Sequence, residues 1–338
     1  MEIVMAIQVL GKKIQLLTVG HLGLVGAFIR ESKIIEYIDS VIPKRSNHKA
    51  HFTHGEVVAL MILNGLGYTS RPLYMCSSYF DAKDVKAILG IEFEAEWFND
   101  DVIGGTMDAL YSYGLTDLFS QISMGIMAYL GRKVETVNID STSFHYHGQE
   151  QKYDNAEDQD YSVPHKINIT YGYSRDGHPE LVQIMEQMMV DNATGIPIYA
   201  ESENGNTNDT NAFNRMIKVF DNFKKYQHDG YVYLCGDAAL YSEGNIQEMD
   251  KLGIKFITRV ADGKIKCVQE FIAEHRDEKL DVIDEINQGK IYDVEHDGVK
   301  QKWLLVHSNS AEDRNEHSVM SRAEKEKAAL LPPNTFTY

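Results

Sequence analysis

The sequence predicts an α/β protein in which a helical N-terminal part is followed by strands that alternate with helices. Residues 134–139 form a strand-forming run that ends at Asp140, and residues 231–236 form a second apolar run that ends at Asp237. Between these runs lies a stretch after Asp209 whose apolar residues recur at helical spacing. We therefore expect both acids at the ends of buried strands, where neighbouring strand ends bring their carboxylates together.

Length and composition indicate the class of protein. The chain has 338 residues, of which 43% are hydrophobic and 25% charged, as is typical of soluble globular proteins with more than one domain. No uncharged apolar run reaches about 18 residues, so we expect no membrane-spanning helix. The N-terminus lacks the basic start and cleavage site of a signal peptide, and the three cysteines show no CxxC spacing. These features predict a cytoplasmic protein without a disulfide or zinc framework.

The charge of the chain is uneven. The formal net charge of −17 argues against a protein that binds polyanions nonspecifically over its whole surface. Residues 1–75, however, hold eight Lys and Arg against five Asp and Glu, which is a net charge of +3, so the remainder carries −20. This asymmetry predicts that any contact with nucleic acid begins in the N-terminal part.

Helical patterns follow one another in the N-terminal part. One amphipathic helix is expected over residues 20–42, and a second opens at a capping box that begins at Thr53. Further helices are expected over residues 83–130, with breaks at Gly90 and at 104–105.

A basic connector joins the first two of these helices. A helix, a basic turn and further helices are compatible with a helix-turn-helix-like DNA-binding module, although most small helical domains bind no DNA, so both interpretations stay open. If the module binds DNA, these basic side chains are expected to contact it: Lys44, Arg45, Lys49 and Arg71.

Histidines also recur every three residues in this connector, at His48, His51 and His54. A zinc site would need a fourth ligand that the stretch does not supply, so a solvated connector is favoured.

Strands dominate after residue 134. Residues 166–173 alternate like a strand, and turn residues follow at 174–179. The Met-rich run at 181–190 could also be helical, but the turn favours the partner strand of a hairpin. A short edge strand is expected at 195–198 and a further strand at 255–260. These elements predict a sheet flanked by helices.

Four regions are expected along the chain. Residues 1–130 form the helical, DNA-binding part, and residues 131–262 form the sheet-based core. In residues 263–310, apolar residues occur in short runs split by charges, which predicts a β-rich insertion. Residues 311–338 form a charged helix and a tail.

Asp140 and Asp237 are the candidate catalytic and metal-binding residues. Carboxylate oxygens at strand ends suit Mg²⁺ or Mn²⁺, which can activate a water or a hydroxyl for attack on phosphate. The alternative, that each Asp caps the following turn or helix, stays open.

His145 and His147 would share one face of an extended segment, as a transition-metal site would require. Surface histidines at a strand exit are the favoured interpretation.

Several short motifs occur in an order and at spacings that resemble insertion-sequence transposases of the DDE class. They are Ile139-Asp140-Ser141-Thr142-Ser143-Phe144, Ile169-Thr170-Tyr171-Gly172-Tyr173-Ser174-Arg175-Asp176, Gly195-Ile196-Pro197, Gly205-Asn206-Thr207-Asn208-Asp209 and Gly236-Asp237-Ala238-Ala239-Leu240-Tyr241. The segment from about Leu24 to Phe80 is similar to a helical domain of unknown function that precedes the core in one branch of these proteins. The resemblance implies a ribonuclease-H-like mixed sheet, metal-dependent DNA cleavage and strand transfer, and Asp140 and Asp237 as the first two acids, 97 residues apart.

The sequence departs from this family near its end. Such proteins carry a third acid in a Tyr-x2-Arg-x3-Glu-x6-Lys pattern, and Arg322 and Glu326 have the Arg-x3-Glu spacing, but Val319 and Pro333 stand at the Tyr and Lys positions. We therefore expect a C-terminally shortened, catalytically impaired transposase. Its partners would be the DNA of the element ends and target, with a homodimer or an assembly with full-length transposase both open. The alternatives are a non-catalytic DNA-binding remnant and a hydrolase that uses two carboxylates as acid and base.

Overall fold

The computed structural model divides the chain into two compact units, Met1–Gly236 and Asp237–Tyr338, and each is described by itself. The residues that the structure describes are 7–9, 12–14, 17–43, 50–67, 72–153, 166–174, 176–225, 232–260, 266–308 and 318–327. Within these ranges, no helix is both long and apolar enough to cross a membrane. The four regions expected from the sequence stay a prediction.

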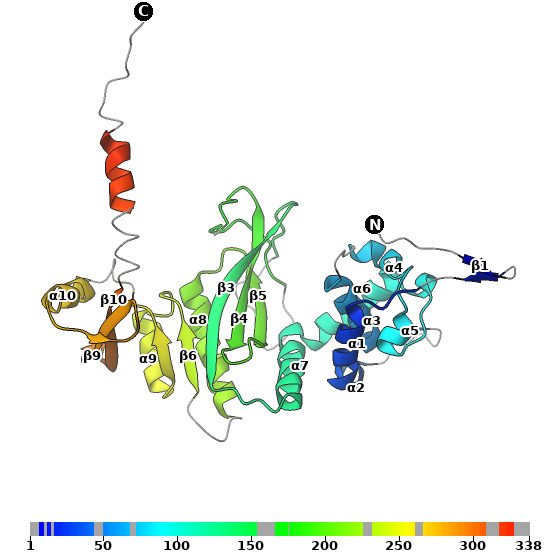
Figure 1. Ribbon diagram of the computed structural model, residues 1–338, viewed down its shortest axis with the longest axis horizontal. Coiled ribbons are helices and arrows are strands. Elements are labelled where there is room, and N and C mark those ends of the chain that lie inside the picture. Colours follow the sequence, from blue (N-terminus) through cyan, green and yellow to red (C-terminus); the bar gives the residue numbers. More distant parts are fainter. Residues whose placement is uncertain are drawn as a thin grey trace, which may run out of the picture. The chain divides into compact units, whose positions relative to one another are not determined.

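The first unit begins with a small hairpin and a set of helices, which confirms the helical N-terminal part (Figure 1). Strands β1 and β2 pair antiparallel. The elements are β1 (Ile7–Val9), β2 (Lys12–Ile14), α1 (Leu22–Glu31), α2 (Ile34–Val41), α3 (His54–Gly65), η1 (Leu73–Met75), α4 (Cys76–Tyr79), α5 (Val85–Leu89), η2 (Ala95–Trp97), α6 (Asp100–Tyr113) and α7 (Leu115–Tyr129). Apolar residues of the helices α1 to α7 share one core, which includes the fully buried Ile38 and Leu60, and Phe98 just before α6 belongs to it as well.

The predicted capping box opens α3. The Thr53 hydroxyl accepts a hydrogen bond from the Glu56 N–H at 3.2 Å, and the Glu56 carboxylate accepts one from the Thr53 N–H at 2.8 Å. These bonds satisfy N–H groups that have no partner inside the helix, so a local sequence pattern is enough to fix this boundary.

Two predicted helix boundaries are wrong. The single helix expected over 20–42 is split into α1 and α2, because Lys33 adopts a left-handed conformation with φ of 57°. The break expected at 104–105 is absent, and α6 continues to Tyr113 and ends before Gly114, where φ is 109°. A glycine inside a helix costs only about 1 kcal/mol, and burial of the apolar face of α6 outweighs that cost.

A mixed sheet forms the rest of the first unit. The strands that this unit contributes are β3 (Thr136–Tyr146), β4 (Val182–Asp191), β5 (Pro197–Asn204) and β6 (Tyr233–Gly236), in the order β5-β4-β3-β6. Strand β3 pairs antiparallel with β4 and parallel with β6, and β4 pairs antiparallel with β5. Helix α8 (Asp209–Lys225) buries Phe213, Met216, Ile217 and Phe220 and pairs Arg215 with the buried Glu203 of β5. This mixed α/β architecture confirms the predicted fold class.

The predicted hairpin is only partly correct. Strand β4 lies where the partner strand was expected, but residues 166–173 are not a strand and form only isolated bridges, from Ile169 to Gln151 and from Thr170 to Gln183. The reason is that β4 is already paired on one side by β3 and, from Ile184 onward, on the other side by β5. The segment meets β4 at Gln183, before the part that β5 covers.

The second unit contains α9 (Glu243–Lys251), β7 (Lys255–Thr258), α10 (Lys266–Glu274), β8 (Asp281–Val282), β9 (Asn287–His296) and β10 (Val299–Ser308). Strands β8, β9 and β10 form an antiparallel sheet in the order β10-β9-β8, as the β-rich pattern of this region predicts. A two-residue turn joins β9 to β10, with φ of 52° at Asp297 and 76° at Gly298. Helix α10 was not predicted, and residues 318–327 form a further helix.

Candidate active site

Asp140 lies inside a strand rather than at its end, which corrects the prediction. Strand β3 continues to Tyr146 because β4 pairs with it along nearly its whole length. The parallel partner β6, in contrast, is paired only with Thr136–Asn138. Asp140 therefore follows the part of β3 that β6 covers, and this is where the abrupt change from apolar to polar residues occurs.

The strand alternation places the Asp140 side chain on the exposed face of the sheet. Its neighbours Ile139 and Ser141 are buried on the other face, whereas Asp140 and Thr142 are exposed. One carboxylate oxygen of Asp140 accepts a hydrogen bond from the Ser141 N–H at 2.8 Å. The carboxylate is thus displayed on an open surface, where it can reach a cation or a large substrate.

A second acid on the same face was not predicted. Glu186 of β4 is paired with Thr142, and Met188 of β4 is paired with Asp140, so Glu186 is a diagonal neighbour of Asp140. Burial raises the pKa of Glu186, and the charge of Glu201 raises it further, whereas a hydrogen bond from the Ser202 hydroxyl opposes this. The period-two pattern of residues 181–190 could have placed Glu186 on this face.

Asp237 is the first residue of the second unit. It directly follows β6, as predicted, and its side chain is exposed. One carboxylate oxygen accepts a hydrogen bond from the Ala239 N–H at 2.9 Å, and the Thr258 hydroxyl donates to the Asp237 carbonyl oxygen at 2.6 Å. The first of these bonds is the turn-capping role that the sequence left open. A carboxylate accepts about four hydrogen bonds or metal contacts, so this role does not prevent metal binding.

The favoured interpretations of the histidines are only partly correct, because His145 is half-buried inside β3 and His54 is buried in α3 rather than solvated. Half-buried His145 contacts the Ser174 hydroxyl at 3.1 Å and Asp176 at 3.6 Å, whereas His147 is exposed beyond the end of β3. The ring of His51 stacks on Trp97. His54 is buried in α3, where its ring contacts the Thr106 hydroxyl at 3.2 Å. His48 lies outside the described residues.

Among the described side chains, no group of three or more His, Cys, Asp or Glu could hold a metal ion. Glu326, the nearest match to the third acid, is exposed in the helix at residues 318–327. The four predicted DNA contacts, Lys44, Arg45, Lys49 and Arg71, lie outside the ranges that the structure describes.

Comparisons with known proteins relate most of the chain to two family models. Residues 14–124 match a domain of unknown function, DUF4277, and residues 134–327 match a domain described as "Transposase DDE domain". No curated protein sequence matches the chain.

Two groups of solved structures are similar. One is the piggyBac transposase synaptic complex with hairpin DNA, at 11% identity and a TM-score of 0.35, covering 83% of this chain and 51% of that chain. Another is the Mos1 transposase paired-end complex with left transposon end, at 12% identity and a TM-score of 0.25, covering 65% of this chain and 62% of that chain. The chain thus spans about half the length of the piggyBac protein and under two thirds of the Mos1 protein.

Proposed function

We propose that this chain, which belongs to the family with the transposase DDE domain, acts on DNA through a divalent cation held by Asp140 and Asp237. The family model covers more than half of the 338 residues and includes both acids. The substrates are the ends of the mobile element and its target DNA, and the ion is Mg²⁺ or Mn²⁺.

The register of two strands is the observation that carries this proposal. In the parallel pair of β3 and β6, Thr136 is matched with Tyr233 and Asn138 with Cys235, an offset of 97 residues. The same offset separates Asp140 from Asp237. Side chains at matched positions of parallel neighbouring strands point to the same face. If the register of β3 and β6 continues to Asp140 and Asp237, the two carboxylates point to the same face, as two acids that share an ion require.

The donors fit the ion. Both candidate ligands are exposed carboxylates, and hard oxygen donors are those that Mg²⁺ and Mn²⁺ prefer. When bound, such an ion supplies Lewis acidity at a phosphodiester. The chain itself contributes the orientation of the carboxylates, because the N–H groups of Ser141 and Ala239 each hold one oxygen in place.

We further propose that catalysis by these 338 residues is impaired. Val319 and Pro333 replace the Tyr and Lys of the pattern that surrounds the third acid. Glu326 has the right spacing from Arg322, but it is exposed in a helix between Lys325 and Lys327. These features indicate a solvated helix rather than one that completes an active site.

The test is to incubate the purified chain with Mn²⁺ and supercoiled DNA that carries the element ends. We expect binding of one ion per chain and no strand transfer, because removing one group from a set that acts together typically costs several orders of magnitude. Robust strand transfer that is lost in Asp140→Asn would contradict the impairment and support the catalytic role. Glu326→Gln would then show whether Glu326 is the third acid.

The same assay separates the alternatives. A non-catalytic DNA-binding remnant, which the departures at Val319 and Pro333 favour, would bind DNA but give no metal-dependent nicking. A hydrolase that uses two carboxylates as acid and base would keep its activity in EDTA. Nicking that requires Mn²⁺ and is lost in Asp140→Asn supports the transposase chemistry.

We also predict that DNA affinity resides in residues 1–130 and that it decreases steeply with salt. Each Lys or Arg that contacts a phosphate adds about 0.9 to the slope of log K against log salt concentration. Substitution of Lys44, Arg45 and Lys49 by Ala should therefore lower both the affinity and the slope, as measured by fluorescence anisotropy. Unchanged binding in this variant would show that the basic connector does not contact the DNA.

Sedimentation of the DNA complex would show whether the chain binds as a homodimer.

A further inference from the structure

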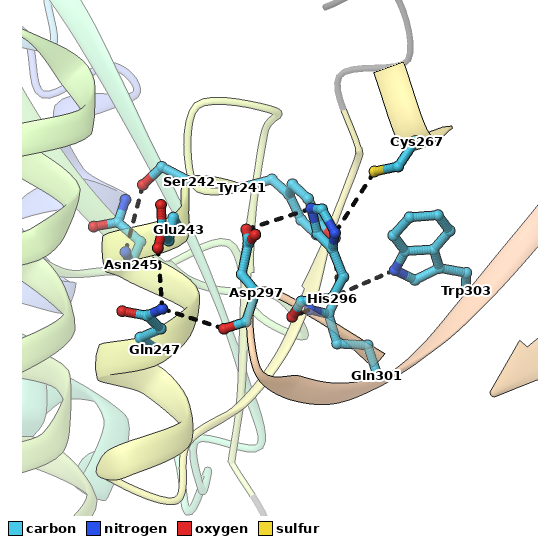
Figure 2. Close-up of polar contacts among 10 residues, drawn as sticks. All are labelled: Tyr241, Ser242, Glu243, Asn245, Gln247, Cys267, His296, Asp297, Gln301 and Trp303. Atoms are coloured by element: carbon cyan, nitrogen blue, oxygen red, sulfur yellow. Dashed lines mark hydrogen bonds and ion pairs between the residues drawn. The ribbon is translucent and has the colours of Figure 1, made fainter. Parts of the chain in front are cut away.

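A cysteine, a histidine and an aspartate form a chain of contacts in the second unit, apart from the two candidate acids (Figure 2). The Cys267 thiol lies 3.6 Å from Nδ1 of His296. The other ring nitrogen, Nε2, lies 3.3 Å from the carboxylate of Asp297. Each end of the imidazole therefore has one partner, with a nucleophile on one side and a carboxylate on the other.

Two elements position these residues. Cys267 is in the first turn of α10, and α10 packs through Phe271, whose ring lies 5.2 Å from those of both Tyr292 and Trp303. His296 ends β9, and Asp297 begins the turn to β10. The thiol and its histidine are thus 29 residues apart in the sequence and are brought together by the packing of the helix on the hairpin.

The His296 ring is held from several sides (Figure 2). It stacks on Tyr241 at an interplanar angle of 6° and meets Trp303 edge-on with ring centroids 5.6 Å apart. Gln301 donates a hydrogen bond to the His296 carbonyl oxygen at 3.1 Å and accepts bonds from the Tyr241 hydroxyl and the Trp303 indole N–H. The ring orientation is therefore fixed before any reaction.

The contacts determine where the ring proton lies. An ionised carboxylate only accepts hydrogen bonds, so the Asp297 carboxylate favours the tautomer with its proton on Nε2 of His296. The lone pair of Nδ1 then faces the Cys267 sulfur and can accept the thiol proton. A nucleophile beside a base that a third group orients is the arrangement found in enzymes that activate a hydroxyl or thiol.

Cys267 also differs from the other two cysteines. It is exposed, whereas Cys76 is buried and Cys235 is half-buried. Burial raises the pKa of Cys76 to about 11 and also raises that of Cys235, which keeps both as unreactive thiols. Cys267 therefore has access to solvent together with a base within reach.

We propose that Cys267 is a covalent modification site for low-molecular-weight disulfides, with His296 as its base and Asp297 as a positioning residue. The Cys267 sulfur, having given its proton to His296, attacks one sulfur of the small disulfide. The S–S bond of the reagent breaks, a mixed disulfide forms on Cys267, and the leaving thiolate takes up the proton. The small disulfide is itself the oxidant, and Cys267 is oxidised as one thiol is released.

A metal site is the less suitable interpretation of this cluster. The thiol and the carboxylate contact different nitrogens of the His296 ring, so the three groups do not converge on one point. The geometry thus fits proton transfer along the chain of contacts better than shared coordination.

The experiment treats the full chain with cystamine at neutral pH and follows adduct formation by intact mass spectrometry and peptide mapping. We expect Cys267 to react first, at least about tenfold faster than the same cysteine in a synthetic peptide of Lys266–Glu274, since a positioned base contributes about a hundredfold or more in enzymes. Equal rates in the folded chain and the peptide would overturn the proposal.

Two variants separate activation from folding. His296→Phe keeps a ring against Tyr241 and Trp303 but removes both nitrogens, and it should lower the rate at Cys267 toward that of the peptide. Asp297→Asn keeps a residue that tolerates the left-handed turn and should lower the rate less. Circular dichroism verifies the fold of both. A folded His296→Phe chain that reacts as fast as the unsubstituted one would also overturn the proposal.

Discussion

Substitution of Asp140 by Asn is expected to weaken Mn²⁺ binding by at least about tenfold, or roughly 1.4 kcal/mol. The amide has nearly the same shape as the carboxylate but lacks its negative charge, and hard divalent cations depend on charged oxygen ligands. Asp237→Asn should have a similar effect. Isothermal titration with Mn²⁺ measures both.

The matched control is Asp108→Asn, which removes one negative charge from an exposed position of α6. It should leave Mn²⁺ affinity unchanged, because an exposed charge that does not contact the ion is screened at ordinary ionic strength. If Asp140→Asn binds Mn²⁺ as tightly as the control does, Asp140 is not a ligand.

Substitution of Gly205 by Ala is expected to lower the free energy of unfolding of the first unit by about 2–3 kcal/mol. Gly205 is buried where three backbone segments meet: its N–H donates to Asn168 at 3.0 Å, and its carbonyl oxygen accepts from the Gln183 side chain at 2.7 Å. An added Cβ would lie 2.6 Å from the Thr170 carbonyl oxygen and closer still to that of Gln183. Because these atoms belong to the backbone, the sheet itself would have to shift.

Gly104→Ala is the matched control for this prediction. Gly104 lies inside α6, and a Cβ there would meet nothing within 4 Å. The substitution should stabilise the chain by up to about 1 kcal/mol, since alanine has the higher helix propensity. Urea denaturation monitored by circular dichroism measures both variants. A Gly205→Ala chain as stable as the unsubstituted one would show that the backbone atoms around Gly205 leave room for a methyl group.

The sequence predicted features that depend on nearby residues. The capping box at Thr53 was correct because its two hydrogen bonds join residues three positions apart. Helix α8 was correct because its apolar residues recur at helical spacing, and strand β4 was correct because the turn before it favoured a strand over a helix. The position of Asp237 directly after β6 was predicted from the same kind of local signal.

Features that depend on distant residues were not predictable. Strand β3 extends past Asp140 because β4 pairs with it. Residues 166–173 are not a strand because β3 and β5 already pair with most of β4. Helix α10 was missed because its stability comes from Phe271 packing on β9 and β10 rather than from propensity. Glu186 was missed because its proximity to Asp140 depends on the register between two strands.

The measurement that tests the central claim most directly is a double-mutant cycle of Mn²⁺ affinity with Asp140→Asn, Asp237→Asn and the double variant. If both acids hold one ion, the losses are strongly non-additive, and the double variant binds little more weakly than either single variant. If the two losses add in full, or if either single variant binds like the unsubstituted chain, Asp140 and Asp237 do not share an ion and the proposed function is wrong.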